Sequence, residues 1–228
     1  MNHILLSRGI LASPKMIPYF KPYIHKNDKV LIVALSHFSK HIDNEDTYNQ
    51  YYGKGGEYYQ KMIDSFFPYG IKESQIEWIH YFKDNQKTAI QKIKNADIIY
   101  LPGGSPDLFM LRIEAFGIKD ILEDHQGLMI GSSAGAMIQM ASYHISPDFD
   151  YPAFRYEKGL DLLKGFSIEV HYRRRKKQKA ALRKVNRAFH HEIYAIPDMG
   201  ALIVTSEGIK CVFPAEKIYN KKGVVKTL

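Results

Sequence analysis

The chain has 228 residues, 45% of them hydrophobic and 25% charged, which is the composition of an ordinary soluble globular protein. This length fits one large domain, residues 1–228, better than two small ones. A chain of this length can bury well over half of its unfolded surface, so it does not need disulfides for stability. The net charge of +8 is local: residues 172–187 hold nine Lys or Arg and no acid, and the rest of the chain carries 23 basic against 24 acidic residues. The charge therefore describes one patch and not a basic protein.

The single cysteine, Cys211, excludes an internal disulfide framework and suits a reducing compartment. Because its neighbours in GIKCVF are apolar, we expect it to be a buried strand residue.

The first ten residues hold only a short apolar run with Arg8 close behind, unlike a signal peptide. Residues 127–145 lack Asp, Glu, Lys and Arg, but their Gly, Ser and Gln content is not that of a membrane span. We expect a cytoplasmic protein that does not span a membrane.

Strand-like and helix-like segments alternate along the first half of the chain. Residues 28–36 (DKVLIVALS) form a continuous apolar run that ends in small residues, typical of a strand buried on both faces. Residues 46–70 begin like a loop and become helical, with Tyr58, Met62 and Phe66 at i, i+4 spacing.

Three further strands are expected at 75–82, 96–104 and 127–133. Asp84 is the expected N-cap of a helix over 84–96, and Ser105 the N-cap of a helix with Pro106 at its first position. Another helix begins within SAGAMIQMA, and the later strand candidates are 165–172, 195–205, 209–215 and 223–228.

This alternation predicts a single α/β domain with a mostly parallel central sheet flanked by helices. In such sheets, binding sites lie beyond the carboxyl ends of the strands. Three of those ends carry suggestive residues here, in ALSHFSKH, LPGGSPD and GSSAGA.

The segment Gly131-Ser132-Ser133-Ala134-Gly135 fits G-x-S-x-G with Ser133 at its centre. In a nucleophile elbow, a sharp strand-to-helix turn lifts the serine out of the sheet, and the glycines allow close backbone approach. An apolar strand before the motif and a helical pattern after it provide the context that the motif requires. An ordinary tight turn capped by Ser133 is the alternative.

A nucleophilic serine needs a base and an oxyanion hole. His171 ends an alternating strand pattern and is the preferred base, while His37 and His41 follow a strand end and fit the same cleft. The N–H of Ala134 is the first expected oxyanion donor, and the Gly103-Gly104 turn is a source of the second.

Four segments, LPGGSPDLFMLR, GSSAGAM, GLDLLKGFSIEVHYRRR and IPDMGALIV, occur in an order that resembles the serine peptidase family of peptidase E (aspartyl dipeptidase) and cyanophycinase. The resemblance runs from about residue 29 to 204. It implies a fold similar to class I glutamine amidotransferases, a flavodoxin-like architecture, with Ser133 where those enzymes use a cysteine. It further implies Ser133 as nucleophile, His171 as base, the amides of Gly104 and Ala134 as oxyanion hole, and no metal or organic cofactor.

The acid that orients His171 has three candidates. In peptidase E-like enzymes it follows the serine by about fifteen residues, which favours Asp148, with Asp150 as a close substitute. Other relatives use an acid in the later segment, here Asp198, although Pro197 replaces the first acid of that pattern. Either aspartate could instead be a turn former, because S-P-D and P-D are common turn dipeptides.

The resemblance implies a small peptide substrate with an acidic residue at the cleaved bond, and an arginine can hold such a carboxylate. Arg173, Arg175 and Arg183 are candidates, although cations on a helix are usually a solvated face. Two alternatives stay open: a nucleic-acid-binding protein acting through residues 172–187, and an inactive relative that binds a ligand. The basic segment has no interleaved aromatic residues, which disfavours nucleic acid. The sequence does not determine the oligomeric state, and a homodimer is one of the states that it allows.

Overall fold

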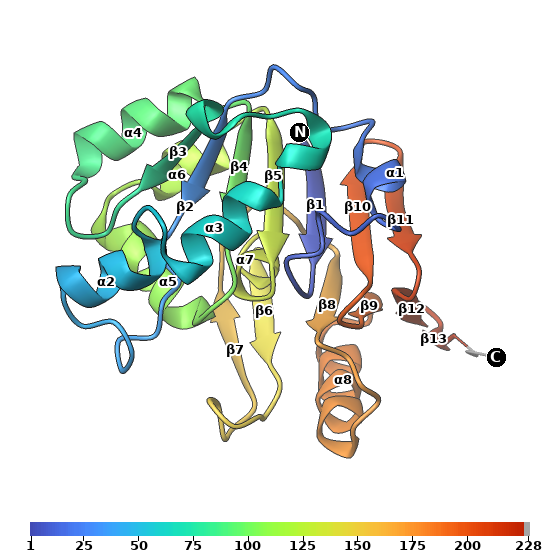
Figure 1. Ribbon diagram of the computed structural model, residues 1–228. Coiled ribbons are helices and arrows are strands. Elements are labelled where there is room, and N and C mark those ends of the chain that lie inside the picture. The colour runs from blue at the N-terminus through green and yellow to red at the C-terminus, as the bar shows by residue number, and fades with distance from the viewer. Residues whose placement is uncertain (226–228) are drawn as a thin grey trace.

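The computed structural model describes residues 1–225, and its main sheet has seven strands in the order β11-β10-β1-β5-β4-β2-β3 (Figure 1). The strands are β1 (Asn2–Leu6), β2 (Val30–Val33), β3 (Ile76–Ile79), β4 (Ile98–Leu101), β5 (Leu128–Ser132), β10 (Ala201–Thr205) and β11 (Gly208–Val212). The five strands from β1 to β3 in this order are parallel, whereas β10 is antiparallel to β1 and to β11. The prediction of a mostly parallel α/β sheet is confirmed.

Helices cover both faces of this sheet, because its buried strands direct alternate side chains to opposite sides. In β2, Leu31 and Val33 join one apolar core, and Val30 and Ile32 join the other. The first core also receives residues of α4 (Gln86–Asn95), α5 (Pro106–Ala115), α6 (Lys119–Glu123) and α7 (Ala134–Met137). The second receives residues of α1 (Ile17–Phe20), α2 (Glu45–Tyr52) and α3 (Glu57–Asp64).

Two smaller sheets lie beyond the carboxyl ends of the central strands (Figure 1). One has the order β13-β12-β9-β8, with β8 parallel to β9, and the other is the antiparallel pair β6-β7. Their elements are β6 (Ser142–Ile145), β7 (Arg155–Lys158), β8 (Phe166–Val170), β9 (Glu192–Ile196), β12 (Glu216–Asn220) and β13 (Gly223–Val224). Helix α8 (Lys176–Phe189) connects β8 to β9.

The strands expected at 28–36, 75–82, 96–104, 127–133 and 165–172 are present as β2, β3, β4, β5 and β8. The segment 195–205 is not one strand, because the turn from Pro197 to Gly200 separates β9 from β10. The sequence analysis did not predict β1, which pairs with β5 in the middle of the sheet, or the β6-β7 pair.

The expectation of a loop at the start of residues 46–70 was wrong. Residues 45–52 are the helix α2, whose N-cap Asn44 accepts a hydrogen bond from the Thr47 N–H at 2.9 Å. Three glycines separate α2 from α3, and a Cβ on one of them, Gly56, would lie 2.6 Å from the Tyr51 carbonyl oxygen.

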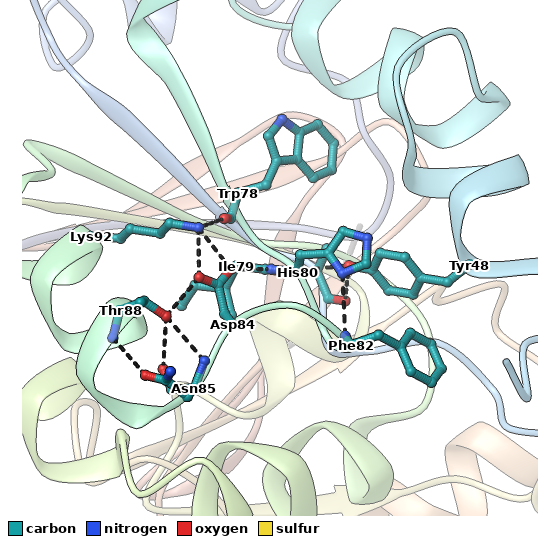
Figure 2. Close-up of polar contacts among 10 residues, drawn as sticks. Tyr48, Trp78, Ile79, His80, Phe82, Asp84, Asn85, Thr88 and Lys92 are labelled. Carbon is teal, nitrogen blue, oxygen red and sulfur yellow. Dashed lines mark hydrogen bonds and ion pairs between the residues drawn. The ribbon is translucent and has the colours of Figure 1, made fainter. Parts of the chain in front are cut away.

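The sequence analysis expected Asp84 to be the N-cap of the helix that is α4, and this expectation was wrong. The cap is Asn85, whose side chain accepts from the Thr88 N–H at 3.1 Å. Figure 2 shows Asp84 beside Lys92, whose Nζ donates to both carboxylate oxygens at 2.8 and 2.7 Å and to the Trp78 carbonyl at 2.8 Å. Burial opposes the ionised form, but the bonds from Lys92, the His80 N–H and Thr88 outweigh it and lower the pKa of Asp84. The carboxylate thus fixes the connection from β3 to α4.

Cys211 lies in the predicted strand, β11, but it is exposed and not buried, because β11 is the edge of the sheet. The strand expected at 223–228 begins as β13, and its last three residues lie outside the described part of the chain. None of the helices within residues 1–225 has the length and apolar character to cross a bilayer.

Gly135 in α7 gives the first testable prediction. A Cβ there would lie 1.9 Å from the carbonyl oxygen of Leu101 in β4, so the helix packs directly on strand backbone. Alanine normally stabilises a helix relative to glycine, but Gly135→Ala should lower the free energy of unfolding by about 2–4 kcal/mol, since backbone must move. Gly165→Ala is the control: its φ is 79° and nothing lies within 4 Å of the added Cβ, so the cost should be only about 1 kcal/mol. Urea unfolding of both variants measures the difference, and equal stabilities would contradict the packing described.

Candidate active site

Ser133 stands on a sharp turn between β5 and α7. Its φ of 50° and ψ of −111° are strained for a residue with a side chain. Its N–H donates to the Leu6 carbonyl at 2.8 Å, and its own carbonyl accepts from the N–H groups of Ala136 and Met137 at 3.0 Å. Ser132 is buried with 4% exposure, whereas Ser133 is half-buried. Of the two adjacent serines, Ser133 is thus the one that the turn presents to solvent.

His171 follows β8 and is hydrogen-bonded to Ser133. The distance from Nε2 to Ser133 Oγ is 2.9 Å, and the distance from Nδ1 to Asp198 Oδ1 is 2.8 Å. Its φ is 51°, and its N–H donates to Ser7 Oγ at 3.0 Å while its carbonyl accepts from Gln178 Nε2 at 3.0 Å. These backbone bonds fix the position of the ring.

Asp198 lies in the turn between β9 and β10, and three cationic or polar groups contact its carboxylate. Besides His171, Arg173 Nη2 donates to Oδ2 at 2.7 Å, and Arg8 Nε lies 3.2 Å from Oδ1. Partial burial by itself raises the pKa of Asp198, but the bonds from His171 and Arg173 and the contact with Arg8 outweigh it. The pKa therefore lies well below its ordinary value, and Asp198 is ionised at neutral pH.

The structure brings Asp198, and not Asp148 or Asp150, to His171. Asp148 Oδ1 accepts from the N–H groups of Asp150 and Tyr151 at 2.9 and 2.8 Å, which makes it a turn former between β6 and β7. Asp150 forms an ion pair with Lys40 at 2.7 Å. Asp148 lies at the expected offset from Ser133, but the hairpin directs its carboxylate to its own loop.

Ala134 directly follows Ser133, and the Gly103-Gly104 turn lies against Ser133, since a Cβ on Gly103 would be 3.3 Å from the Ser133 Cβ. Gly104 has a φ of 148°, and a Cβ on it would lie 2.1 Å from the Ser36 carbonyl oxygen, so this turn requires glycine. Ser36 holds the turn: its hydroxyl donates to the Gly103 carbonyl at 2.7 Å, and its carbonyl accepts from the Ser105 N–H at 2.7 Å. Within residues 1–225 the N–H groups of Gly104 and Ala134 have no hydrogen-bond acceptor.

Two cavities meet at Ser133 and Gly104, which line both of them. The aromatic cavity, of about 930 Å³, is walled by Phe38, Tyr51, Tyr52, Tyr58 and Tyr100 and includes His37, His41 and Arg8. The basic cavity, of about 610 Å³, includes His171, Arg173, Arg175, Lys176 and Lys177, and the buried pair His144 and Glu169. Ser133 therefore stands where the two cavities meet.

The three candidate substrate-binding arginines have different positions. Arg173 binds Asp198, and both Arg173 and Arg175 line the basic cavity. Arg183 lies on the exposed face of α8 and lines neither cavity.

Within the described residues, no group of three or more His, Cys, Asp and Glu is arranged to hold a metal ion.

The sequence analysis missed Ser7 and Arg8. Both follow β1, and the Ser7 hydroxyl also donates to the Ile196 carbonyl. The sequence does carry a signal for this strand, the apolar run of residues 4–6. Like the other strands that end at the site, the run is followed by polar residues, but three residues are too few to predict a strand. Without β1 in the sheet, nothing indicated that Ser7 and Arg8 would reach the carboxyl end of β5.

Comparisons with known proteins identify the fold and the family of this chain. The fold is similar to that of a candidate peptidase E protein from Listeria monocytogenes EGD-e, with a TM-score of 0.66 and 17% identity over 92% of this chain and 97% of that one. A peptidase from an acI-B1 Actinobacterium has a TM-score of 0.67 and 14% identity over 96% of this chain and 94% of that one. No curated protein matches the chain. The model of peptidase family S51 matches residues 50–212, which is most of the chain. The protein therefore belongs to peptidase family S51 and is a serine peptidase.

Proposed function

We propose that this serine peptidase hydrolyses short peptides next to an acidic residue, with Ser133 as nucleophile, His171 as base and Asp198 as the orienting acid. The observation that carries the proposal is the continuous chain of hydrogen bonds from Ser133 Oγ through His171 to Asp198, at 2.9 and 2.8 Å. Nucleophile, base and orienting acid within hydrogen-bond distance are the arrangement that activates a serine.

In the first step, Ser133 Oγ attacks the scissile carbonyl carbon and its proton passes to His171 Nε2. The Asp198 carboxylate holds Nδ1–H and stabilises the imidazolium that forms. The C–N bond then breaks as His171 gives the proton to the leaving amine, which leaves an ester on Ser133. Water attacks this ester, His171 takes a proton from the water and returns it to Ser133 Oγ, and the free acid leaves.

The amides of Gly104 and Ala134 are the proposed oxyanion hole. Ala134 follows Ser133 in the chain, Gly104 lines the same cavity as Ser133, and neither N–H has an acceptor within residues 1–225. Two preorganised donors at the developing oxyanion lower the barrier, and the loss of one costs on the order of 100-fold or more in rate. The two hydrogen bonds of Ser36, to the Gly103 carbonyl and from the Ser105 N–H, hold the backbone on both sides of Gly104 and so fix the position of its N–H.

An acidic substrate is supported by the charges around Ser133. Arg173, Arg175, Lys176 and Lys177 line the basic cavity, and Arg8 lines the aromatic cavity. Guanidinium groups recognise carboxylates with paired hydrogen bonds, which ammonium groups cannot provide. The two acidic residues that line the basic cavity already accept hydrogen bonds from the protein: Glu169 from His144 and Ser146, and Asp148 from the backbone of its own loop.

Ser133→Ala and His171→Ala should each lower kcat by at least about 10⁴-fold, because each removes a member of the hydrogen-bonded chain. The measurement is release of free amino acids from a dipeptide mixture that includes Asp-X members. Thermal unfolding of both variants should stay within a few degrees of wild type, which separates lost chemistry from lost fold. Undiminished turnover in either variant would refute the proposed roles.

The choice of acid is tested by Asp198→Asn against Asp148→Asn. Asp198→Asn removes the charge that supports the imidazolium and should lower kcat about 10²- to 10⁴-fold. In Asp148→Asn the amide oxygen can still accept from the Asp150 and Tyr151 N–H groups, so kcat should change less than about 3-fold. The opposite ranking would make Asp148 the orienting acid.

The lowered pKa of Asp198 also predicts a pH dependence of stability. Because the carboxylate is more acidic in the folded state than in the unfolded chain, its stabilisation is fully present above about pH 5, declines progressively as pH falls below about 4, and is fully lost only below the folded-state pKa. Asp198→Asn lacks this contribution at every pH. Thermal unfolding should therefore show a difference between wild type and variant that is largest near neutral pH and shrinks toward pH 3. A difference that does not vary with pH would contradict this.

A further inference from the structure

The aromatic cavity contains an arginine, Arg8, whose two terminal nitrogens have no hydrogen-bond acceptor within residues 1–225. Among the described residues that line it, the charged side chains are Arg8, Lys61 and Asp64. Lys61 pairs with Glu57 at 2.5 Å, and Asp64 accepts from Gln60 at 2.8 Å. His37 also lines the cavity, but burial and the nearby Arg112 lower the pKa of His37 to about 4, so it is neutral at pH 7.

The contact of Arg8 with Asp198 is from Nε to Oδ1, at 3.2 Å. Within residues 1–225, neither of its terminal nitrogens donates to an acceptor, and the side chain is 55% exposed. Nη1 and Nη2 form the end of the guanidinium fork that binds a carboxylate with two hydrogen bonds. Arg8 and Ser133 line the same cavity, so a peptide that occupies this cavity at Ser133 shares it with the Arg8 side chain.

The charge balance at Asp198 favours an additional anion. Asp198 carries one negative charge and contacts two guanidinium groups, those of Arg8 and Arg173. Arg173 holds Oδ2 with the shorter contact, 2.7 Å against 3.2 Å for Arg8. The charge of Asp198 is thus balanced by Arg173, and the charge of Arg8 is in excess beside the aromatic cavity.

We propose that Arg8 is a specificity-determining residue that binds a carboxylate of the substrate in the aromatic cavity. The inference rests on the proposed function, and it identifies the group that would select acidic peptides. The carboxylate is that of an acidic side chain or of the peptide's own terminus, and both would bind the same fork. The aromatic walls of the cavity would contact the apolar atoms next to that carboxylate.

The test compares wild type with Arg8→Gln on three peptides: Asp-Leu, Asn-Leu, and Asp-Leu with an amidated carboxyl end. If Arg8 binds the side chain, the wild-type preference for Asp-Leu over Asn-Leu should fall by about 10- to 100-fold in the variant. If it binds the terminus, the preference for the free acid over the amide should fall instead. In the variant, kcat/KM should fall further for the peptide that carries the bound carboxylate than for its neutral counterpart, because only the former loses the paired hydrogen bonds. Unchanged preferences on both comparisons would overturn the proposal.

Arg173→Gln is the matched control, because Arg173 also contacts Asp198 but does not line the aromatic cavity. If arginines act here only by positioning Asp198, both variants should lower kcat on all three peptides alike, which also contradicts the proposal. Calorimetric binding of the same peptides to Ser133→Ala, with and without Arg8→Gln, requires no turnover. Arg8-dependent binding without cleavage by wild type would refute the proposed hydrolysis of acidic peptides but would support the carboxylate site. Binding that does not depend on Arg8 would refute the carboxylate site.

Discussion

The site depends on one strained backbone position, that of Ser133. Its positive φ would be costly in a free chain, and the surrounding sheet maintains it through the hydrogen bond from the Ser133 N–H to the Leu6 carbonyl. Leu6 can supply this bond because β1 lies parallel to β5 in the middle of the sheet, with Leu6 opposite Ser132. Gly135 then allows α7 to pack on the β4 backbone, so the strain is held by rigid elements on two sides. The consequence is a hydroxyl directed out of the strand, toward His171.

The hydrogen-bonded chain is assembled from two sheets. Ser133 belongs to the end of β5 in the main sheet, whereas His171 and Asp198 follow β8 and β9, which are parallel neighbours in the smaller sheet. The Ser7 hydroxyl connects the two sheets, since it accepts from the His171 N–H and donates to the Ile196 carbonyl. The orientation of the imidazole is therefore a property of the contact between sheets and not of any single loop.

Asp198 combines structural and electrostatic roles because its carboxylate has a partner from each surrounding segment. One oxygen is shared by His171 and Arg8, and the other is held by Arg173. Arg8 reaches the aromatic cavity and Arg173 the basic cavity, so a single carboxylate anchors one guanidinium on each side of Ser133. A carboxylate with several cationic donors stays ionised, and it orients its partners at little cost, because each bond fixes groups that are already ordered.

The sequence by itself determined the α/β class, most of the strands that end at the site and the turn that carries Ser133, because apolar runs, glycine turns and the G-x-S-x-G pattern are local features. His171 and Gly104 were assigned through the resemblance to the peptidase E family, because no local pattern distinguishes them from the other histidines and glycines of the chain. The tertiary structure decided which acid meets His171: Asp148 and Asp198 are both aspartates in turns, and only the packing of β9 beside β8 shows that Asp198 reaches the imidazole. It also decided the position of Arg8, since β1 is a strand of five residues whose place beside β5 depends on contacts more than a hundred residues apart. Local patterns specify elements, whereas the pairing of distant strand ends is decided only when the sheets are packed.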